Sequence, residues 1–362
     1  MTAARLRVGV IGTSWWADLE HLPGLLARPD VELVSLCGRD PARLAALADR
    51  YRIPRTFTDW RGMIAGGGLD VLVIATPNVL HRPQALAAID AGLHLVCEKP
   101  LALSVSEARE MAARAEAADR KTLVFFTHRA VAAAGHVKRL VGDGFLGRPL
   151  HVSATYFSGS QLRPQKPLAW RMVRAESGTG VLGDIGSHLV DLVRWWLGDV
   201  SRVAGQWQTG IRERPGGEAD ADEDCSFLAQ MACGAQAVFQ ASKLAAGRSN
   251  HQRIEIHGDR GSLVYEAEPG FDATWEGRLY AGRPEVHGME PVPLARDLAA
   301  GLDTGDPRAN RNEAYRRLTE PFFAAIRQGG AVSPDFRDGA AVQAVLDAVA
   351  ESAERNRWVD VA

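Results

Sequence analysis

The chain has 362 residues, of which 46% are hydrophobic and 24% are charged, and its formal net charge is -2 at pH 7. Such a composition is ordinary for a globular protein long enough for two domains. The weak net charge gives no reason to expect a nucleic acid or a membrane as partner. No apolar stretch approaches the ~20 residues that a membrane helix needs, and the chain starts without a charged leader followed by an apolar segment.

Strands and helices alternate through the first third of the chain. Apolar runs predict strands over residues 6–11, 31–37, 71–75, 93–97 and 123–126. Helical patterns lie between them, over residues 16–26, 41–51, 83–91 and 104–118. This alternation indicates βαβ units and a parallel sheet. We therefore expect residues 1–127 to form a Rossmann-type dinucleotide-binding domain.

The pattern changes near residue 128, where a helix over residues 131–141 begins a different arrangement. Short turns separate the strand-like runs that follow, at residues 150–157, 200–207, 225–231, 235–242, 253–257 and 262–265. A helix over residues 181–197 interrupts these runs, and two helices over residues 312–327 and 338–354 close the chain. We predict an exposed loop over residues 210–224 and mostly irregular structure over residues 268–310.

The predicted fold class is α/β, with a Rossmann domain followed by an α+β domain over residues 128–362. The second domain should bind substrate and oligomerise, and its sheet should be open and mainly antiparallel. An alternative placement for the two closing helices, residues 312–327 and 338–354, is against the first domain. The cysteines form neither a CxxC pair nor a metal-ligand spacing, so we expect no metal site and a reducing, cytoplasmic compartment: Cys37, Cys97, Cys225 and Cys233.

The turn after the first strand carries a glycine-rich motif. Its sequence runs Gly9-Val10-Ile11-Gly12-Thr13-Ser14-Trp15-Trp16-Ala17 and matches GxGxxG/A imperfectly, because Ser14 replaces the middle glycine. Serine is small and adds a hydroxyl donor, while backbone N–H groups at the helix start still attract a phosphate. We predict that Gly12, Thr13, Ser14 and Trp15 contact the cofactor; the alternative is an ordinary strand–helix turn without a ligand.

The end of the second strand bears on the cofactor's ribose. An acidic residue there would favour NAD, but this chain has Arg39 followed by Asp40. Arginine stacks on adenine and pairs with a 2′-phosphate, so we favour NADP(H), with NAD(H) as the alternative. The alternative without cofactor contact is that Asp40 only caps the next helix and Arg39 is solvated.

Open α/β sheets bind ligands in a crevice at the carboxyl ends of their strands, and two further strand ends should face it. Thr76, Asn78 and His81 follow the third strand, where an Asx-type turn is the structural alternative. Glu98-Lys99-Pro100 follows the fourth strand. The chain has only five lysines and otherwise prefers arginine, and lysine differs in having a pKa that burial and neighbours can move. We predict that the cofactor is contacted by Thr76, Asn78, His81, Glu98 and Lys99, and that Lys99 also contacts substrate.

A second constellation lies near residue 184. Asp184, His188 and Asp191 are spaced i, i+4, i+7 and would share one face of a helix. A carboxylate beside a histidine orients the ring and suits it to be a general base. The alternatives are a helix cap at Asp184 with a satisfied core histidine, or a metal site for which no third ligand is spaced. Lys166 competes with Lys99 but follows no strand. Further candidates for substrate contact are His128, Tyr156, Trp170 and Arg171.

Together these motifs resemble the Gfo/Idh/MocA family of oxidoreductases. The resemblance runs from Gly9-Val10-Ile11-Gly12 through Ala75-Thr76-Pro77-Asn78 and Glu98-Lys99-Pro100 to Gly183-Asp184-Ile185-Gly186-Ser187-His188, and includes residues 334–339 and 357–359. It implies NAD(P)-linked hydride transfer on sugars, polyols or related carbonyls, and a homodimer or homotetramer formed through the C-terminal sheet. The family's catalytic lysine falls on Lys99, and its aspartate and histidine fall on Asp184 and His188.

The sequence thus predicts an NAD(P)-dependent dehydrogenase or reductase with a small sugar-like substrate. His188 would exchange the hydroxyl proton, Lys99 would stabilise charge on the same oxygen, and Asp184 would hold His188 or a second hydroxyl. Two alternatives stay open. One is a sugar enzyme that recycles its NAD without net redox change, and the other is a dinucleotide-binding sensor that has lost catalysis.

Overall fold

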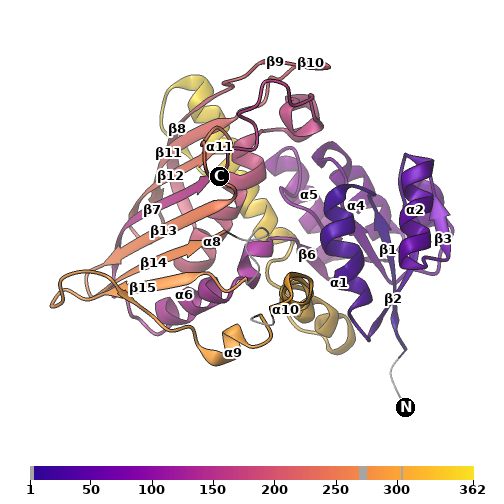
Figure 1. Ribbon diagram of the computed structural model, residues 1–362, viewed down its shortest axis with the longest axis horizontal. Helices are drawn as coiled ribbons and strands as arrows, with labels where there is room; N and C mark the ends of the chain where they lie inside the picture. Colours follow the sequence, from indigo (N-terminus) through magenta and orange to yellow (C-terminus); the bar gives the residue numbers. More distant parts are fainter. Residues whose placement is uncertain (1–3, 269–274, 303–304) are drawn as a thin grey trace. The chain divides into compact units, whose positions relative to one another are not determined.

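The computed structural model describes residues 4–268, 275–302 and 305–362, which form two compact units (Figure 1). Unit 1 runs to Phe126 and adds Arg311–Ala340. Unit 2 comprises Thr127–Asn310 and Ala341–Ala362. The first break thus lies one residue before the predicted boundary, and a C-terminal segment belongs to unit 1.

A parallel sheet is the centre of unit 1. Its strands lie in the order β3-β2-β1-β4-β5-β6. Their bounds are β1 Leu6–Ile11, β2 Val31–Cys37, β3 Arg55–Phe57, β4 Val71–Ile74, β5 His94–Cys97 and β6 Thr122–Val124. Consecutive residues of β4 and β5 are fully buried, which is typical of a parallel sheet covered on both faces. Only β3 was not predicted, because three residues carry no readable periodicity.

Helices connect these strands. A π-helical turn, Ala17–His21, leads into α1 Leu22–Leu26, and the others are α2 Pro41–Tyr51, α3 Trp60–Ala65, the 3-10 helix Asn78–Leu80, α4 His81–Asp90 and α5 Val105–Ala117. Asp40 caps α2 by accepting from the N–H groups of Ala42 (3.0 Å) and Arg43 (3.2 Å). Ser104 caps α5 by accepting from the N–H of Glu107.

The C-terminal helix α10, Pro307–Gln328, completes the core of unit 1. Its Tyr315 packs on Phe125, with ring centroids 5.2 Å apart. The guanidinium of Arg28 lies 4.4 Å from the centre of the Phe323 ring and pairs with Glu320 at 3.0 Å. These contacts explain why a segment so late in the chain belongs to the first compact unit.

Gly12 directly follows β1 and lies against the backbone of Ala75, which directly follows β4. Its φ of +128° is rarely adopted by residues with a side chain. A Cβ atom at this position would lie 2.2 Å from the carbonyl oxygen of Ala75. Only glycine therefore allows the backbone after β1 to approach the backbone after β4.

Unit 2 is built on a mixed, mainly antiparallel sheet in the order β16-β15-β14-β13-β7-β12-β11-β8-β17. The strands are β7 Pro149–Phe157, β8 Val200–Gln208, β11 Asp224–Met231, β12 Gln236–Ser242, β13 His251–Gly258, β14 Ser262–Ala267, β15 Arg278–Gly282, β16 Glu290–Pro291 and β17 Val359–Asp360. β7 and β12 pair in parallel, and the other pairings are antiparallel.

One face of this sheet is covered by helices, as Figure 1 shows for α6 and α8. The helical elements of this part of the chain are the 3-10 helix Thr127–Ala130, α6 Ala132–Gly142, the 3-10 helix Trp170–Met172, α7 Arg174–Ser177, the π-helical turn Leu182–Gly186, α8 Ser187–Leu197, α9 Arg296–Ala299 and the end of α11 Phe336–Arg355. On the opposite face, Leu228 of β11 is exposed by 50%. None of the helices in the described ranges is both long and apolar enough to cross a bilayer.

The predicted exposed loop over residues 210–224 is wrong in part. It contains the hairpin of β9 Glu213–Arg214 and β10 Gly217–Glu218, and several of its charged side chains are buried. Arg214 pairs with Glu223, and Asp222 accepts from the N–H groups of Gly180 (2.5 Å) and Leu182 (2.7 Å). Polarity misled the prediction because these charges find partners inside the protein.

The region predicted as mostly irregular, residues 268–310, contains β15, β16 and α9. Residues 269–274 and 303–304 of that region lie outside the described residues.

Replacing Gly12 by alanine tests the close approach of the two strands. Gly12→Ala should lower stability by roughly 3 kcal/mol, because strain at φ +128° adds to overlap with the Ala75 carbonyl. The matched control is Gly92→Ala, which also has positive φ but no atom within 4 Å of the added Cβ; it should cost about 1 kcal/mol. Thermal unfolding of both variants measures the difference, and equal costs would contradict the argument.

Candidate functional site

The strand register of unit 1 brings four predicted segments to one edge of its sheet. Ile11 at the end of β1 pairs with Cys37 of β2 and with Ile74 of β4. Ile74 in turn pairs with Cys97 of β5. The residues that follow these strands therefore begin side by side: Gly12, Arg39, Thr76 and Lys99. Strand order reverses between β1 and β4, and crevices at such points bind ligands in open α/β sheets.

Glu98 is buried at this edge and has partners from the first helical segment. Its Oε1 accepts from Nε1 of Trp16 at 2.7 Å and lies 2.8 Å from Nε2 of His21. Burial alone would raise the pKa of Glu98, but His21, Lys99 and Trp16 together outweigh it and hold the pKa below its ordinary value. The side chain before Lys99 is therefore an ionised carboxylate fixed from two directions.

His81 is fully buried, and its ring joins two of the strand ends. Nε2 lies 3.0 Å from the carbonyl oxygen of Thr76, and Nδ1 lies 3.1 Å from that of Pro100. Burial lowers its pKa, against the effect of these carbonyls. This placement makes His81 a support for the edge, and its predicted direct contact with cofactor stays a prediction.

The glycine-rich turn shows a use for the serine that replaces glycine. The Oγ atom of Ser14 accepts from the N–H of Ala17 at 3.3 Å, so the hydroxyl caps the helical segment that follows. Trp15 is 57% exposed and packs edge-on against Trp16. Arg39 is exposed, and the neighbouring Asp40 carboxylate is occupied by its cap.

In unit 2, His188 lies in a cluster of aromatic side chains. Its ring stacks on His128 with centroids 3.8 Å apart, and the ring of Tyr156 lies 6.4 Å away. The Gln252 amide donates to Nδ1 of His128 at 2.5 Å and accepts from Tyr265 at 3.3 Å. These bonds fix the orientation of the His128 ring against which His188 packs.

Asp184 is held by two cations. Its Oδ2 accepts from Nζ of Lys243 at 2.5 Å, and its Oδ1 lies 3.4 Å from Nε of Arg171. The Arg171 guanidinium also lies over the ring of Trp170 at 4.2 Å. Burial and then the charge of Asp184 raise the pKa of the Tyr156 hydroxyl, so Tyr156 remains a protonated donor near this carboxylate.

The three residues that were predicted to share one helix face lie in two consecutive helical elements. Asp184 lies in the π-helical turn Leu182–Gly186, and His188 and Asp191 lie in α8. Asp191 is buried and forms a two-bond ion pair with Arg129, at 2.6 Å and 2.9 Å. Asp191 therefore has a structural partner of its own.

Lys166, the rejected competitor of Lys99, lies in a loop and donates to the carbonyl of Ser160 at 2.9 Å. Burial lowers its pKa first, and the positive charges of Lys243 and Arg214 lower it further. No group of three or more His, Cys, Asp or Glu side chains within the described ranges could hold a metal ion.

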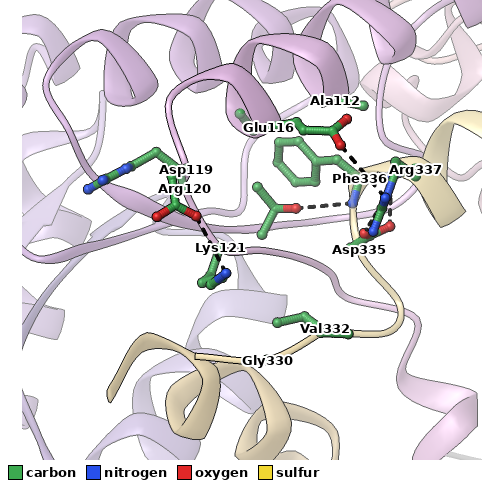
Figure 2. A pocket seen from close by; sticks show the side chains of 13 residues that line it. Ala112, Glu116, Asp119, Arg120, Lys121, Gly330, Val332, Asp335, Phe336 and Arg337 are labelled. Atoms are coloured by element: carbon green, nitrogen blue, oxygen red, sulfur yellow. Dashed lines mark hydrogen bonds and ion pairs between the residues drawn. The ribbon is translucent and has the colours of Figure 1, made fainter. Parts of the chain in front are cut away.

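A cavity of about 250 Å³ lies elsewhere in unit 1 (Figure 2). It is lined by the end of α5, the start of β6 and the segment before α11. Its charged side chains pair with one another, Lys121 with Asp119 at 3.5 Å and Arg337 with Asp335 at 2.9 Å. Because it lies at the amino end of β6, it is unrelated to the ligand-binding edge.

Comparison with known proteins identifies the family. One family model, the oxidoreductase family with an NAD-binding Rossmann fold, matches residues 6–126, and another, the GFO/IDH/MocA C-terminal domain, matches residues 135–264. The levoglucosan dehydrogenase of Pseudarthrobacter phenanthrenivorans is 34% identical over 353 residues, covering 89% of this chain and 87% of that protein. The chain belongs to the Gfo/Idh/MocA family.

Other relatives agree with this family assignment. The inositol 2-dehydrogenase of Rhizobium meliloti is 25% identical over 99% of both chains. A solved levoglucosan dehydrogenase in complex with NADH and levoglucosan has a TM-score of 0.89 at 31% identity, covering 99% of both chains. The protein is therefore an NAD-binding oxidoreductase of the sugar and polyol dehydrogenase type, as the sequence predicted.

The edge described above fits the dinucleotide of a Gfo/Idh/MocA protein. Gly12 lets the backbone after β1 pass close to β4 without a side chain in the way. The helical segment that begins at Trp15 starts directly after this turn, which is where a pyrophosphate binds in such sheets. Thr76 and Glu98-Lys99 follow the neighbouring strands and would flank the bound group.

Sequence reasoning missed three residues that contact candidate site residues within their own unit: His21 in unit 1, and Lys243 and Gln252 in unit 2. His21 and Gln252 gave no local signal, since each acts through a residue distant in sequence. Lys243 had one, because it is one of five lysines in an arginine-rich chain and directly follows a predicted strand. The same reasoning that singled out Lys99 would have found it.

Neutralising the buried Asp191 tests its structural role. Asp191→Asn should destabilise the protein by about 3 kcal/mol, because it removes the carboxylate that pairs with the buried Arg129 guanidinium. The control is Glu218→Gln, which removes the carboxylate of an exposed ion pair with Arg212 and should change stability little. Chemical denaturation measures both, and similar small effects would contradict this role.

Proposed function

We propose that this protein is an NAD(P)-dependent dehydrogenase or reductase for a sugar, polyol or related alcohol or carbonyl compound. The observation that carries the proposal is the edge at which Gly12, Thr76 and Lys99 follow neighbouring strands of an NAD-binding sheet. A bound nicotinamide supplies the hydride chemistry. The protein must then position the substrate carbon and manage the hydroxyl proton.

We assign the proton to His188 and charge stabilisation to Lys99. Stacking on His128 holds the His188 ring in place, which suits a side chain that takes a proton from the substrate hydroxyl and returns it in the reverse reaction. The Lys99 ammonium would donate a hydrogen bond to the reacting oxygen and stabilise its developing negative charge. Asp184, paired with Lys243 and Arg171, would accept from a second hydroxyl.

The substrate class follows from the surroundings and the relatives. The side chains proposed to contact substrate combine aromatic rings with hydrogen-bonding groups: His128, Tyr156, Trp170 and Arg171. Such a combination suits a polyhydroxy compound. The named relatives act on levoglucosan and inositol according to their descriptions, and both are compounds of this kind. The exposed face of the unit 2 sheet, which includes Leu228, supports a homodimer or homotetramer as the assembly.

For the cofactor we propose a preference for NADP(H) over NAD(H). Arg39 is exposed directly after β2, and Asp40 uses its carboxylate for the α2 cap. The cap directs Oδ1 of Asp40 toward the α2 backbone, whereas the arginine beside it pairs well with a 2′-phosphate. NAD(H) is the alternative, since the relative with a solved complex binds NADH.

Turnover measurements test the proposed reaction. Purified protein should change nicotinamide absorbance with at least one compound in a panel of levoglucosan, inositols, polyols and sugars. His188→Ala and Lys99→Ala should each lower kcat by roughly 10²–10⁴-fold while cofactor still binds. Full activity in either variant would remove that residue from the mechanism. Tight cofactor binding without an absorbance change for any compound of the panel would favour the non-redox enzyme or the sensor.

Comparing the two cofactors tests Arg39. Arg39→Ala should lower kcat/KM for NADP⁺ by about 10-fold or more and change that for NAD⁺ little, because only NADP⁺ carries the phosphate that arginine pairs with. Arg61→Ala removes an arginine whose guanidinium stacks on Trp60 in α3 and serves as control. Equal losses with both cofactors would contradict the NADP preference.

A further inference from the structure

Lys243 is a buried lysine that none of the proposed steps uses directly. It directly follows β12, and its backbone is fixed on both sides: its N–H donates to the carbonyl of Glu223 at 2.9 Å, and its own carbonyl accepts from Gln161 at 3.1 Å. Its side chain is only 5% exposed. A lysine in such a place must have a specific partner, because an unpaired buried ammonium is costly.

The partner is the carboxylate of Asp184, and the pair is asymmetric. Nζ of Lys243 donates to Oδ2 of Asp184 at 2.5 Å. The Asp184 side chain is 21% exposed, so it is the more accessible member of the pair. A carboxylate has about four acceptor positions, so Asp184 keeps acceptor capacity for a ligand while the lysine holds it from the buried side.

The charges of Lys243 and Asp184 shift the pKa values of neighbouring side chains. Positive charge on Lys243 is the second cause, after burial, of the lowered pKa of Lys166. Negative charge on Asp184 is the second cause, after burial, of the raised pKa of Tyr156. Arg171 approaches the other carboxylate oxygen at 3.4 Å, from the 3-10 helix Trp170–Met172.

We propose that Lys243 is a positioning residue for the reaction. It holds the Asp184 carboxylate in one orientation through their ion pair, so that the carboxylate accepts a hydrogen bond from a substrate hydroxyl that does not react. This inference rests on the proposed function, and it separates the roles of two neighbours in the chain: Asp184 fixes the substrate, and His188 carries the proton. Lys243 acts entirely through Asp184 and does not touch the reacting atoms.

A double-mutant cycle tests the inference, using the sugar or polyol that the wild type turns over fastest. Lys243→Met should lower kcat/KM by about 10- to 100-fold, the size expected for losing a charge-assisted hydrogen bond. The loss should lie mainly in KM, because a non-reacting hydroxyl is held in ground and transition states alike. Lys243→Arg should recover to within about fivefold of wild type, since it restores a cation.

The decisive arm is Lys243→Met combined with Asp184→Asn. If Lys243 acts through Asp184, adding Lys243→Met to Asp184→Asn should cost less than about threefold more. Lys166→Met is the matched control, because it removes a neighbouring lysine charge without the hydrogen bond to Asp184; its effect should also stay below about threefold. Cofactor binding and thermal unfolding report whether each variant is folded.

The outcomes separate the two proposals. A wild type that turns over no compound of the panel overturns the proposed function. If the wild type is active, three results would overturn the role of Lys243. The effects of Lys243→Met and Asp184→Asn on kcat/KM could be additive, Lys243→Met could leave kcat/KM unchanged, or its loss could lie in kcat alone. Should Lys243→Met fail to fold, Lys243→Arg decides in its place: a loss as large as that of Asp184→Asn would contradict positioning by charge.

Discussion

Removing a carboxylate from water costs several kcal/mol unless hydrogen bonds and opposite charge replace the lost hydration. This cost governs the polar interior of both units. Glu98 is held by Trp16 and His21, and Asp191 is held by Arg129. Asp184, which is only partly buried, has its cation on the buried side. In each case the partner comes from a segment distant in sequence, so the pairing requires the complete fold of that unit.

The same constraint separates groups that support the site from groups that act in it. Charged groups that are both buried and paired with each other, such as Asp191 and Arg129, contribute rigidity. Partners with an accessible member, such as Lys243 and Asp184, leave one group able to meet a ligand. His81 belongs to the first class, because both of its ring nitrogens face backbone carbonyls. Residue type alone does not reveal this distinction.

Backbone geometry positions the residues at the carboxyl ends of the unit 1 strands, as paired charges position side chains in the interior. Parallel strands of matched register end together, so the residues after β1, β4 and β5 begin side by side. Gly12 allows the closest of these approaches, and Ser14 starts the helical segment by capping it. The imperfect glycine motif therefore retains the strand–turn–helix geometry on which pyrophosphate binding depends, with the serine contributing a cap where the usual motif has glycine.

Local information was enough for most of the fold and for the residues at strand ends. Hydrophobic periodicity and caps predicted β1, β2 and α2 at their observed bounds, and the motifs at Lys99 and His188 indicated the family. Lys243, Gln252 and His21 could not be paired with their partners in this way, nor could the π-helical turn at Asp184 be foreseen. Periodicity and capping depend on neighbours within a few residues, whereas burial of a charge depends on what the folded chain brings beside it.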